Sequence, residues 1–154
     1  MNSMEIEKKY LIRRLPDNLE NYPRREIQQA YLCTEPVVRV RKEDDTYYLT
    51  YKGKGMMMRE EYNLPLNRDA YEHLLAKADG NIISKTRYLI PLEGGLTAEL
   101  DRFHSPDSAL IMAEVEFVSE EQALTFTPPD WFGEEVTRDR RYHNSYMSQA
   151  AYNG

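Results

Sequence analysis

Short segments in which charged and apolar residues alternate recur along almost the whole chain. In Met4–Ile12, for example, Glu5, Glu7 and Lys9 stand at alternate positions. Side chains two residues apart in a β-strand point to the same face of the sheet, so this period predicts strands with one ionic and one apolar face. The chain is therefore expected to fold mainly as a β-sheet whose ionic faces lie together.

Eight strands are predicted, each bounded by turn signals. They are Met4–Ile12, Glu26–Cys33, Val37–Lys42, Thr46–Lys52, Arg59–Leu66, Ile82–Pro91, Gly95–Phe103 and Ala109–Val118. Three helices are expected: one is capped by Asn67 and ends at Gly80, one is capped by Ser119, and the last begins at Thr137. No internal repeat divides the chain, so we expect residues 1–154 to form a single domain.

The composition argues against several classes of protein. A net charge of -6, from 26 acidic and 20 basic residues, disfavours a nucleic-acid-binding protein. No apolar run approaches the roughly 18 residues that would cross a bilayer, and the first ten residues lack the apolar core of a signal peptide. We therefore expect a cytoplasmic protein with no membrane partner. The single cysteine, Cys33, excludes an internal disulfide, and its apolar neighbours predict a buried thiol.

The predicted ionic faces carry charged residues in pairs of one sign. The acidic pairs are Glu5/Glu7, Glu99/Asp101 and Glu114/Glu116, and the basic pairs are Arg39/Arg41 and Lys85/Arg87. Neighbouring carboxylates repel each other unless a positive charge lies between them, and divalent cations prefer several carboxylate oxygens. Arginine, in turn, matches phosphate oxygens with two parallel hydrogen bonds. A solvated sheet face would explain any single strand, but the repeated pairs favour a site for a metal ion and a phosphate compound.

A closed barrel would bring both kinds of pair around one cavity if the ionic faces point inward. About eight strands are enough to enclose a small ligand. Helices would then cover the apolar outer faces. A cavity of this kind suits a polyphosphate, because reaction at phosphorus needs charge neutralisation and alignment more than a covalent nucleophile.

A series of short motifs follows a fixed order along the chain. The first is Glu5-Ile6-Glu7-Lys8-Lys9, which is similar to the ExExK signature of the CYTH superfamily, the triphosphate tunnel metalloenzymes. The later motifs resemble those of the same family: Gln29-x-Tyr31-Leu32, Arg39-x-Arg41, Lys52-Gly53, Arg59-Glu60-Glu61, Lys85-x-Arg87-Tyr88, Glu99-x-Asp101-x-Phe103, Ala113-Glu114-Val115-Glu116 and Glu135-Val136-Thr137-x-Asp139-x-x-Tyr142-x-Asn144. ExExK alone occurs by chance in charged proteins, whereas the ordered series covers nearly the whole chain and is specific.

The resemblance implies an α+β fold, with an eight-stranded antiparallel closed barrel forming a triphosphate tunnel and helices packed outside it. In compact bacterial members a C-terminal helix can plug one end of the tunnel, and Thr137–Tyr152 is expected to do so here. Asn63 stands where many members carry a second acidic residue, which argues against a full second metal site.

The resemblance also implies roles for individual residues and a requirement for Mg²⁺ or Mn²⁺. Glu5, Glu7 and Glu116 would hold the metal, with Glu114 and Glu61 as further acidic ligands or water-positioning groups. The expected metal set is thus Glu5, Glu7, Glu114 and Glu116, and the catalytic set adds Lys9 and Glu61. The residues expected to bind phosphate are Lys9, Arg39, Arg41, Lys52, Lys85 and Arg87.

These observations predict a metal-dependent hydrolase of triphosphates, with inorganic tripolyphosphate as the leading substrate. Four alternatives stay open: an adenylate cyclase of class IV type, a thiamine triphosphatase, a nucleoside triphosphatase, and a non-catalytic polyphosphate-binding module. The last is disfavoured because a pure anion binder gains nothing from carboxylates in its site. The expected partner is a small triphosphate substrate, and both a monomer and a homodimer are compatible with the sequence.

Overall fold

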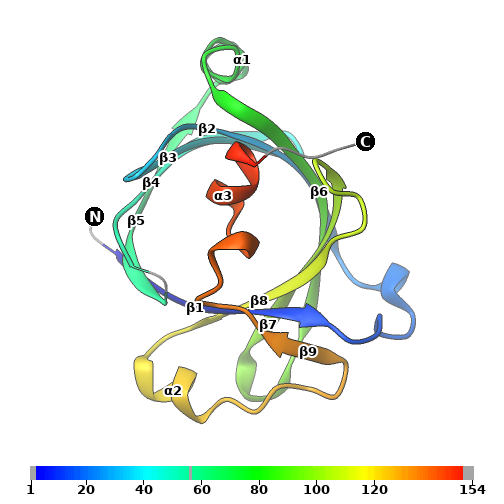
Figure 1. Ribbon diagram of the computed structural model, residues 1–154. Helices are drawn as coiled ribbons and strands as arrows, with labels where there is room; N and C mark the ends of the chain where they lie inside the picture. The colour runs from blue at the N-terminus through cyan, green and yellow to red at the C-terminus, as the bar shows by residue number, and fades with distance from the viewer. Residues whose placement is uncertain (1–2, 56, 151–154) are drawn as a thin grey trace.

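In the described residues nine β-strands form one antiparallel sheet, in which β1 to β8 close as the expected eight-stranded barrel and β9 is added outside it along β1 (Figure 1). The structure is a computed structural model that describes residues 3–55 and 57–150. The sheet order is β5-β4-β3-β2-β6-β7-β8-β1-β9, and an additional pairing of β5 with β1 closes the barrel. The strands are β1 Ser3–Ile12, β2 Arg24–Thr34, β3 Val37–Glu43, β4 Thr46–Lys52, β5 Met58–Leu66, β6 Asp79–Pro91, β7 Thr97–Ser105, β8 Ile111–Phe117 and β9 Phe132–Glu135.

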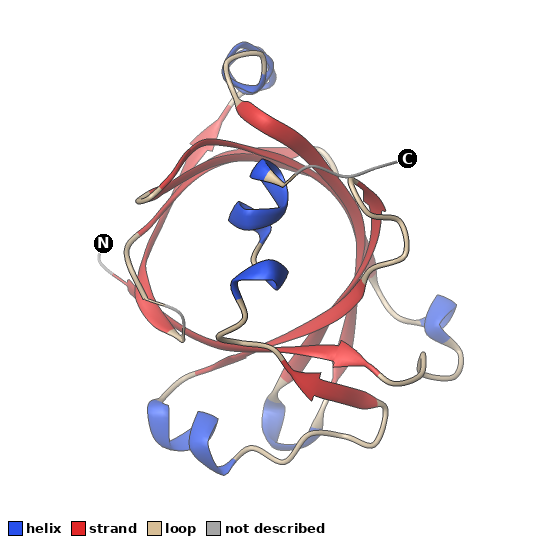
Figure 2. Cartoon of the chain, viewed as in Figure 1, coloured by secondary structure: helices blue, strands red, loops and turns tan. Residues whose placement is uncertain are grey.

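Three α-helices and three short 3-10 helices complete the fold (Figure 2). They are α1 Arg68–Leu75, α2 Glu120–Thr125 and α3 Asn144–Gln149, with η1 Leu19–Asn21, η2 Glu93–Gly95 and η3 Arg140–Tyr142. The side chain of Asn67 accepts a hydrogen bond from the Ala70 amide at 2.7 Å, and Ser119 accepts one from the Gln122 amide at 3.1 Å. Both predicted N-caps are therefore confirmed. Within the described residues no helix is long and apolar enough to span a membrane.

The prediction of one continuous helix from Thr137 was wrong. The chain instead forms β9 beside β1, and only afterwards η3 and α3. The Val136 amide donates to the Lys9 carbonyl at 2.8 Å, and the Lys9 amide donates to Thr137 Oγ1 at 3.0 Å. These bonds complete the edge of β1 with extended backbone, so the helix cannot begin at this residue. Tyr152, the expected end of the plug, lies outside the described residues.

The larger hydrophobic core lies on the outside of the barrel. Apolar side chains on one face of β1, β6, β7 and β8 pack there with residues of α2, β9 and η1. Figure 1 shows α2 and β9 outside the barrel. The buried members are Ile6, Tyr10, Leu19, Tyr88, Ile90, Ala98, Leu100, Ala113, Val115, Phe117, Ala123 and Phe132. This packing confirms the expected cover on the apolar faces and leaves the opposite, ionic faces of the same strands to line the interior.

A smaller apolar cluster surrounds α3 inside the barrel. Met147 of α3 packs with buried side chains of β2, β3, β6, β7 and β8, and Figure 1 shows α3 across the barrel interior. The other buried members are Tyr31, Val37, Ile83, Phe103 and Met112. The C-terminal helix thus plugs the barrel, as expected, and seals that end with apolar contacts.

Cys33 is exposed, which contradicts the prediction of a buried thiol. The pairing of β2 with β3 shifts in register between Tyr31 and Cys33, close to the end of the strand. Because of this irregularity the apolar run that ends at Cys33 does not continue into the barrel interior.

Candidate active site

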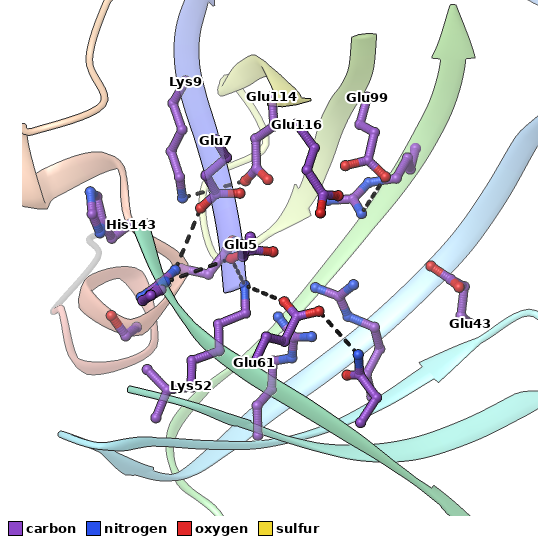
Figure 3. A pocket seen from close by; sticks show the side chains of 18 of the residues that line it. Glu5, Glu7, Lys9, Glu43, Lys52, Glu61, Glu99, Glu114, Glu116 and His143 are labelled. Carbon is purple, nitrogen blue, oxygen red and sulfur yellow. Dashed lines mark hydrogen bonds and ion pairs between the residues drawn. The ribbon is translucent and has the colours of Figure 1, made fainter. Parts of the chain in front are cut away.

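A cavity of about 190 Å³ occupies the ionic part of the barrel interior, and we call it the tunnel cavity (Figure 3). Ten of the eleven predicted site residues line it: Glu5, Glu7, Lys9, Arg39, Arg41, Lys52, Glu61, Arg87, Glu114 and Glu116. Each comes from an alternate position of its strand, which is why strand periodicity could find them. The remaining predicted residue, Lys85, is outside the described lining of the cavity.

Several lining residues were missed by the sequence analysis. Arg59 shares a strand face with Glu61 and Asn63, so the two-residue period contained the signal for it. His143, Asn144 and Ser145 come from the start of the C-terminal plug, whose position depends on the tertiary fold. Arg25, Glu43 and Glu99 also line the cavity, and we call these three residues the mouth. Figure 3 shows Glu43 and Glu99 on the side opposite His143.

Five glutamates form an acidic wall on one side of the tunnel cavity: Glu5, Glu7, Glu61, Glu114 and Glu116 (Figure 3). β1 and β8 hold four of them in register, with Glu7 opposite Glu116 and Lys9 opposite Glu114. Lys52 Nζ lies 3.0 Å from Glu5 and 3.3 Å from Glu61, and Lys9 Nζ lies 3.3 Å from Glu114. Lysine side chains thus already neutralise part of the wall.

The ionisation of the acidic wall is strongly perturbed. Burial raises the pKa of Glu5 to about 8, and the charge of Glu7 and a hydrogen bond with Glu61 add to the rise, while Lys52 opposes it. Burial and the charge of Glu114 raise the pKa of Glu7. Burial also disfavours the ionised form of Glu61, but the hydrogen bond from Glu5 and the charge of Lys52 lower its pKa to about 2. Burial likewise disfavours the ionised form of Glu114, but the charges of Lys9 and Arg87 lower its pKa well below the ordinary value. The wall therefore combines two carboxylates that neighbouring groups stabilise as anions, Glu61 and Glu114, with two whose charge is disfavoured, Glu5 and Glu7.

The chemistry of the acidic wall fits a hard divalent cation. A divalent cation would reduce the repulsion among these buried carboxylates, because it binds several carboxylate oxygens at once. Burial, followed by Glu99 and Glu61, also raises the pKa of Glu116. In the described part of the chain, no three acidic or histidine side chains already converge as ligands of one ion. Lys9, Lys52 and Arg59 instead take the positions between the carboxylates.

Two arginines form a basic wall on β3: Arg39 and Arg41. Arg39 Nη2 donates to Thr50 Oγ1 at 3.2 Å, and its buried Nε has no hydrogen-bond partner among the described residues. Arg41 Nε donates to Gln29 Oε1 at 2.7 Å. Burial and the neighbouring Arg41 lower the pKa of Arg39. Two buried guanidinium groups held by neutral partners leave strong donors for an anionic ligand.

Lys85 and Arg87 are placed differently from the other predicted phosphate-binding residues. Arg87 grips Asp101 with two hydrogen bonds of 2.8 and 2.9 Å, and Lys85 Nζ lies 2.7 Å from the same carboxylate. Lys85 also lies over the Phe103 ring at 5.1 Å, and burial lowers its pKa to about 7. This buried ion triad joins the ionic part of the interior to the apolar cluster around α3.

His143 presents a neutral imidazole to the tunnel cavity. Its Nε2 lies 2.8 Å from the carbonyl oxygen of Thr137, and because a carbonyl only accepts hydrogen bonds, Nε2 must carry the proton. Burial and the charge of Lys9 lower the pKa of His143, which favours the neutral form. Nδ1 is consequently left as an acceptor.

The comparisons with known proteins agree with this geometry. A family model described as CYTH domain matches residues 3–126. The chain belongs to the CYTH domain family. A curated inorganic triphosphatase of Nitrosomonas europaea is 40% identical over 148 residues, covering 94% of this chain and 96% of the relative. An inorganic triphosphatase of Acetivibrio thermocellus is 34% identical over 154 residues, covering 96% of this chain and 95% of the relative.

The CYTH barrel is also similar to solved structures. The crystal structure of the inorganic triphosphatase NE1496 superposes with a TM-score of 0.73 at 36% sequence identity, covering 97% of each chain. The match with the family model ends before β9 and the plug, so the CYTH model itself does not include His143, Asn144 and Ser145. The triphosphatase relatives, by contrast, align over almost the full length.

Without divalent cations, the free energy of unfolding should fall as the pH rises from about 5 to 8. The folded protein keeps a proton on Glu5 up to about pH 8, whereas the unfolded chain releases it near the ordinary value of 4.5. Fewer protons are then bound in the unfolded state, so stability decreases by at most about 1.4 kcal/mol per pH unit for this one group. Melting temperatures of wild type and Glu5→Gln across this range test the assignment. An equal slope in both proteins would contradict it.

Proposed function

We propose that this CYTH protein hydrolyses inorganic tripolyphosphate to orthophosphate and pyrophosphate with the help of a divalent metal ion. The observation that carries the proposal is the basic wall: Arg39 and Arg41 are buried beside the tunnel cavity with neutral hydrogen-bond partners, and five glutamates line the same cavity. A linear triphosphate bound to Mg²⁺ or Mn²⁺ complements both walls at once. The names of the two curated relatives support the same activity.

In this proposal Glu5, Glu7, Glu114 and Glu116 would hold the metal, which would supply Lewis-acid stabilisation of phosphate oxygens. Arg39 and Arg41 bind the triphosphate oxygens and keep the chain aligned along the barrel axis. Lys9 and Lys52 contact carboxylates of the acidic wall and also face the cavity, so they are able to bind phosphate oxygens there. Glu61, whose pKa is lowered, stays ionised and accepts a hydrogen bond from the attacking water.

The proposed activity needs the whole chain as one domain. The family match ends at residue 126, yet His143, Asn144 and Ser145 contribute to the lining of the tunnel cavity. We place the enzyme in the cytoplasm, and the free, exposed thiol of Cys33 supports a reducing compartment.

Tripolyphosphate should be cleaved at least about tenfold more efficiently than ATP in kcat/KM, or about 1.4 kcal/mol of differential transition-state binding. The lining is mostly charged and suits phosphate. Of its two tyrosines, Tyr31 is 3% exposed and packs in the apolar cluster around α3, and the Tyr48 hydroxyl lies 3.5 Å from Arg41 Nη1. Phosphate release from tripolyphosphate, thiamine triphosphate and ATP, each with Mg²⁺ or Mn²⁺, measures the preference.

Two results of that screen would contradict the proposal. Full activity in excess EDTA would exclude the role given to the acidic wall. Cyclic AMP as the product from ATP, at an efficiency comparable with tripolyphosphate cleavage, would identify a cyclase. Of the three consecutive methionines that precede Arg59, Met57 packs against the outer core and Met58 is exposed, while Met56 lies outside the described residues.

A further inference from the structure

A second cavity of about 440 Å³ lies behind the tunnel cavity, and we call it the rear cavity. Its walls are the turn between β2 and β3, the loop that follows β4, and one side of the C-terminal segment. The lining of the rear cavity includes Glu35, Lys54, Arg59, Arg140, His143 and Ser145. Val37, Arg59, His143 and Ser145 line both cavities, so the two spaces adjoin at these four residues, which we call the partition.

The charge of the rear cavity favours an anion. Lys54, Arg59 and Arg140 line it, against the single carboxylate of Glu35. Lys54 and Arg140 are exposed, so their charges are accessible to a ligand from solvent. The mouth, by contrast, combines Glu43 and Glu99 with Arg25, and Arg25 already lies 3.4 Å from Glu43. An anion inside the barrel therefore finds more unneutralised positive charge at the rear than at the mouth.

Arg59 is the side chain best suited to open the partition. Its contacts with the acidic wall are long, 3.6 Å to Glu5 and 3.5 Å to Glu7, and its Nε is buried without a hydrogen-bond partner among the described residues. Arg87, with bonds of 2.8 and 2.9 Å to Asp101, is held far more firmly. When Glu5 and Glu7 bind a divalent cation, Arg59 loses the attraction of both carboxylates and is free to turn toward the rear cavity.

The plug closes one end of the barrel, so a product formed beside it needs another way out. Met147 and the apolar cluster around it close the barrel axis, so a product formed beside the plug lies behind the rest of the substrate. Cleavage of tripolyphosphate leaves two anions in one narrow cavity of about 190 Å³. If both products left by the mouth, the product beside the plug could dissociate only after the product nearer the mouth had dissociated.

We propose that the rear cavity binds inorganic phosphate and is the exit for phosphate released at the plugged end of the tunnel. The exit rests on the proposed tripolyphosphatase activity, whereas binding of phosphate by the rear cavity does not. Lys54 and Arg140 attract the phosphate anion, and the Arg59 side chain stays in contact with it while it turns from the tunnel cavity toward the rear cavity. The four residues of the partition line both spaces, so a movement of Arg59 changes the boundary between them.

The binding part is tested by titrating metal-free protein with inorganic phosphate and recording backbone amide NMR spectra. Two groups of amides should shift with separate affinities: one beside the basic wall, such as Thr50, and one around the rear cavity, such as Gly53, Gly55 and Tyr146. In a Lys54→Glu/Arg140→Glu variant the second group should bind at least about tenfold more weakly, and the first should be unchanged.

The matched control is Lys77→Glu/Arg102→Glu, which makes the same change in net charge at exposed sites away from the rear cavity. It should leave both groups of shifts as in wild type. The phosphate site is wrong if only the Thr50 group responds, or if the control weakens the second group as much as the rear-cavity variant does.

The exit is tested by kinetics on the same three proteins with metal present. In the rear-cavity variant kcat over many turnovers should fall about tenfold, while the single-turnover rate of cleavage stays at the wild-type value. An unchanged kcat, or an equal loss in both rates, would overturn the exit. If wild type cleaves no tripolyphosphate, the proposed function and the exit fail together, and the phosphate site is still decided by the NMR titration.

Discussion

Glu7→Gln should lower kcat for tripolyphosphate by at least about 100-fold, because it removes the charge of a proposed metal ligand without changing the size of the side chain. The variant should still melt at or above the wild-type temperature when no metal is present. Glu7 is only 4% exposed and lies opposite Glu116, and burial together with the charge of Glu114 raises its pKa. Replacing it with a neutral amide removes a charge that the fold penalises.

Three measurements separate this expectation from a loss of structure: kcat, metal affinity by calorimetry, and the melting temperature with and without Mg²⁺ or Mn²⁺. Wild type should be stabilised by the metal, and Glu7→Gln much less so, because a ligand that binds only the folded state raises stability in proportion to its affinity. Glu60→Gln is the control, since Glu60 is exposed and accepts a hydrogen bond from Tyr62. Unchanged metal affinity in Glu7→Gln would remove Glu7 from the proposed metal site.

The barrel and most of its lining could be predicted from the sequence because strand periodicity is a local signal. Glu5, Glu7 and Lys9 are separated by two residues, and so are Glu114 and Glu116, so each set had to share a face. The ordered motifs then indicated which face is internal. All of these residues line the tunnel cavity.

Periodicity identifies the face of a strand but not the depth along the barrel axis. Lys85 and Arg87 share a face, yet only Arg87 reaches the tunnel cavity, and both are paired with Asp101. Phe103 occupies the same face of β7 as Asp101 and belongs to the apolar seal. Where the ionic interior changes to an apolar one depends on the stagger of the strands, which the local pattern does not contain.

The C-terminal segment was mispredicted because the deciding contacts are far apart in the sequence. Thr137 is a good helix cap by residue type, but its hydroxyl accepts a hydrogen bond from Lys9, 128 residues away. β9 completes the edge of β1 on the side where β5 ends, and this pairing fixes an extended backbone. His143 and Ser145 reach both cavities only as a result of that pairing.

Arg39→Ala and Arg87→Ala should separate a ligand-binding arginine from a structural one, although both are buried beside the same cavity. Arg39→Ala is expected to lower kcat/KM by about 100-fold, or about 2.7 kcal/mol, because in the proposed function its guanidinium binds oxygens whose charge changes during the reaction. The melting temperature of this variant should stay the same or rise, since Arg41 and burial already disfavour the charge of Arg39. Water in the cavity fills the space that is left.

Arg87→Ala should lower the stability of the protein more than its activity. The change breaks the two bonds to Asp101 and leaves that carboxylate with Lys85 alone, which costs about 3 kcal/mol for a buried ion pair. For a chain of this size the loss corresponds to a fall of about 10 °C in melting temperature. Activity at a temperature where both variants are folded should decrease less in Arg87→Ala than in Arg39→Ala. A large fall in the melting temperature of Arg39→Ala would instead show that the basic wall stabilises the barrel, and the phosphate contacts would then have to come from Lys9, Lys52 and Arg41.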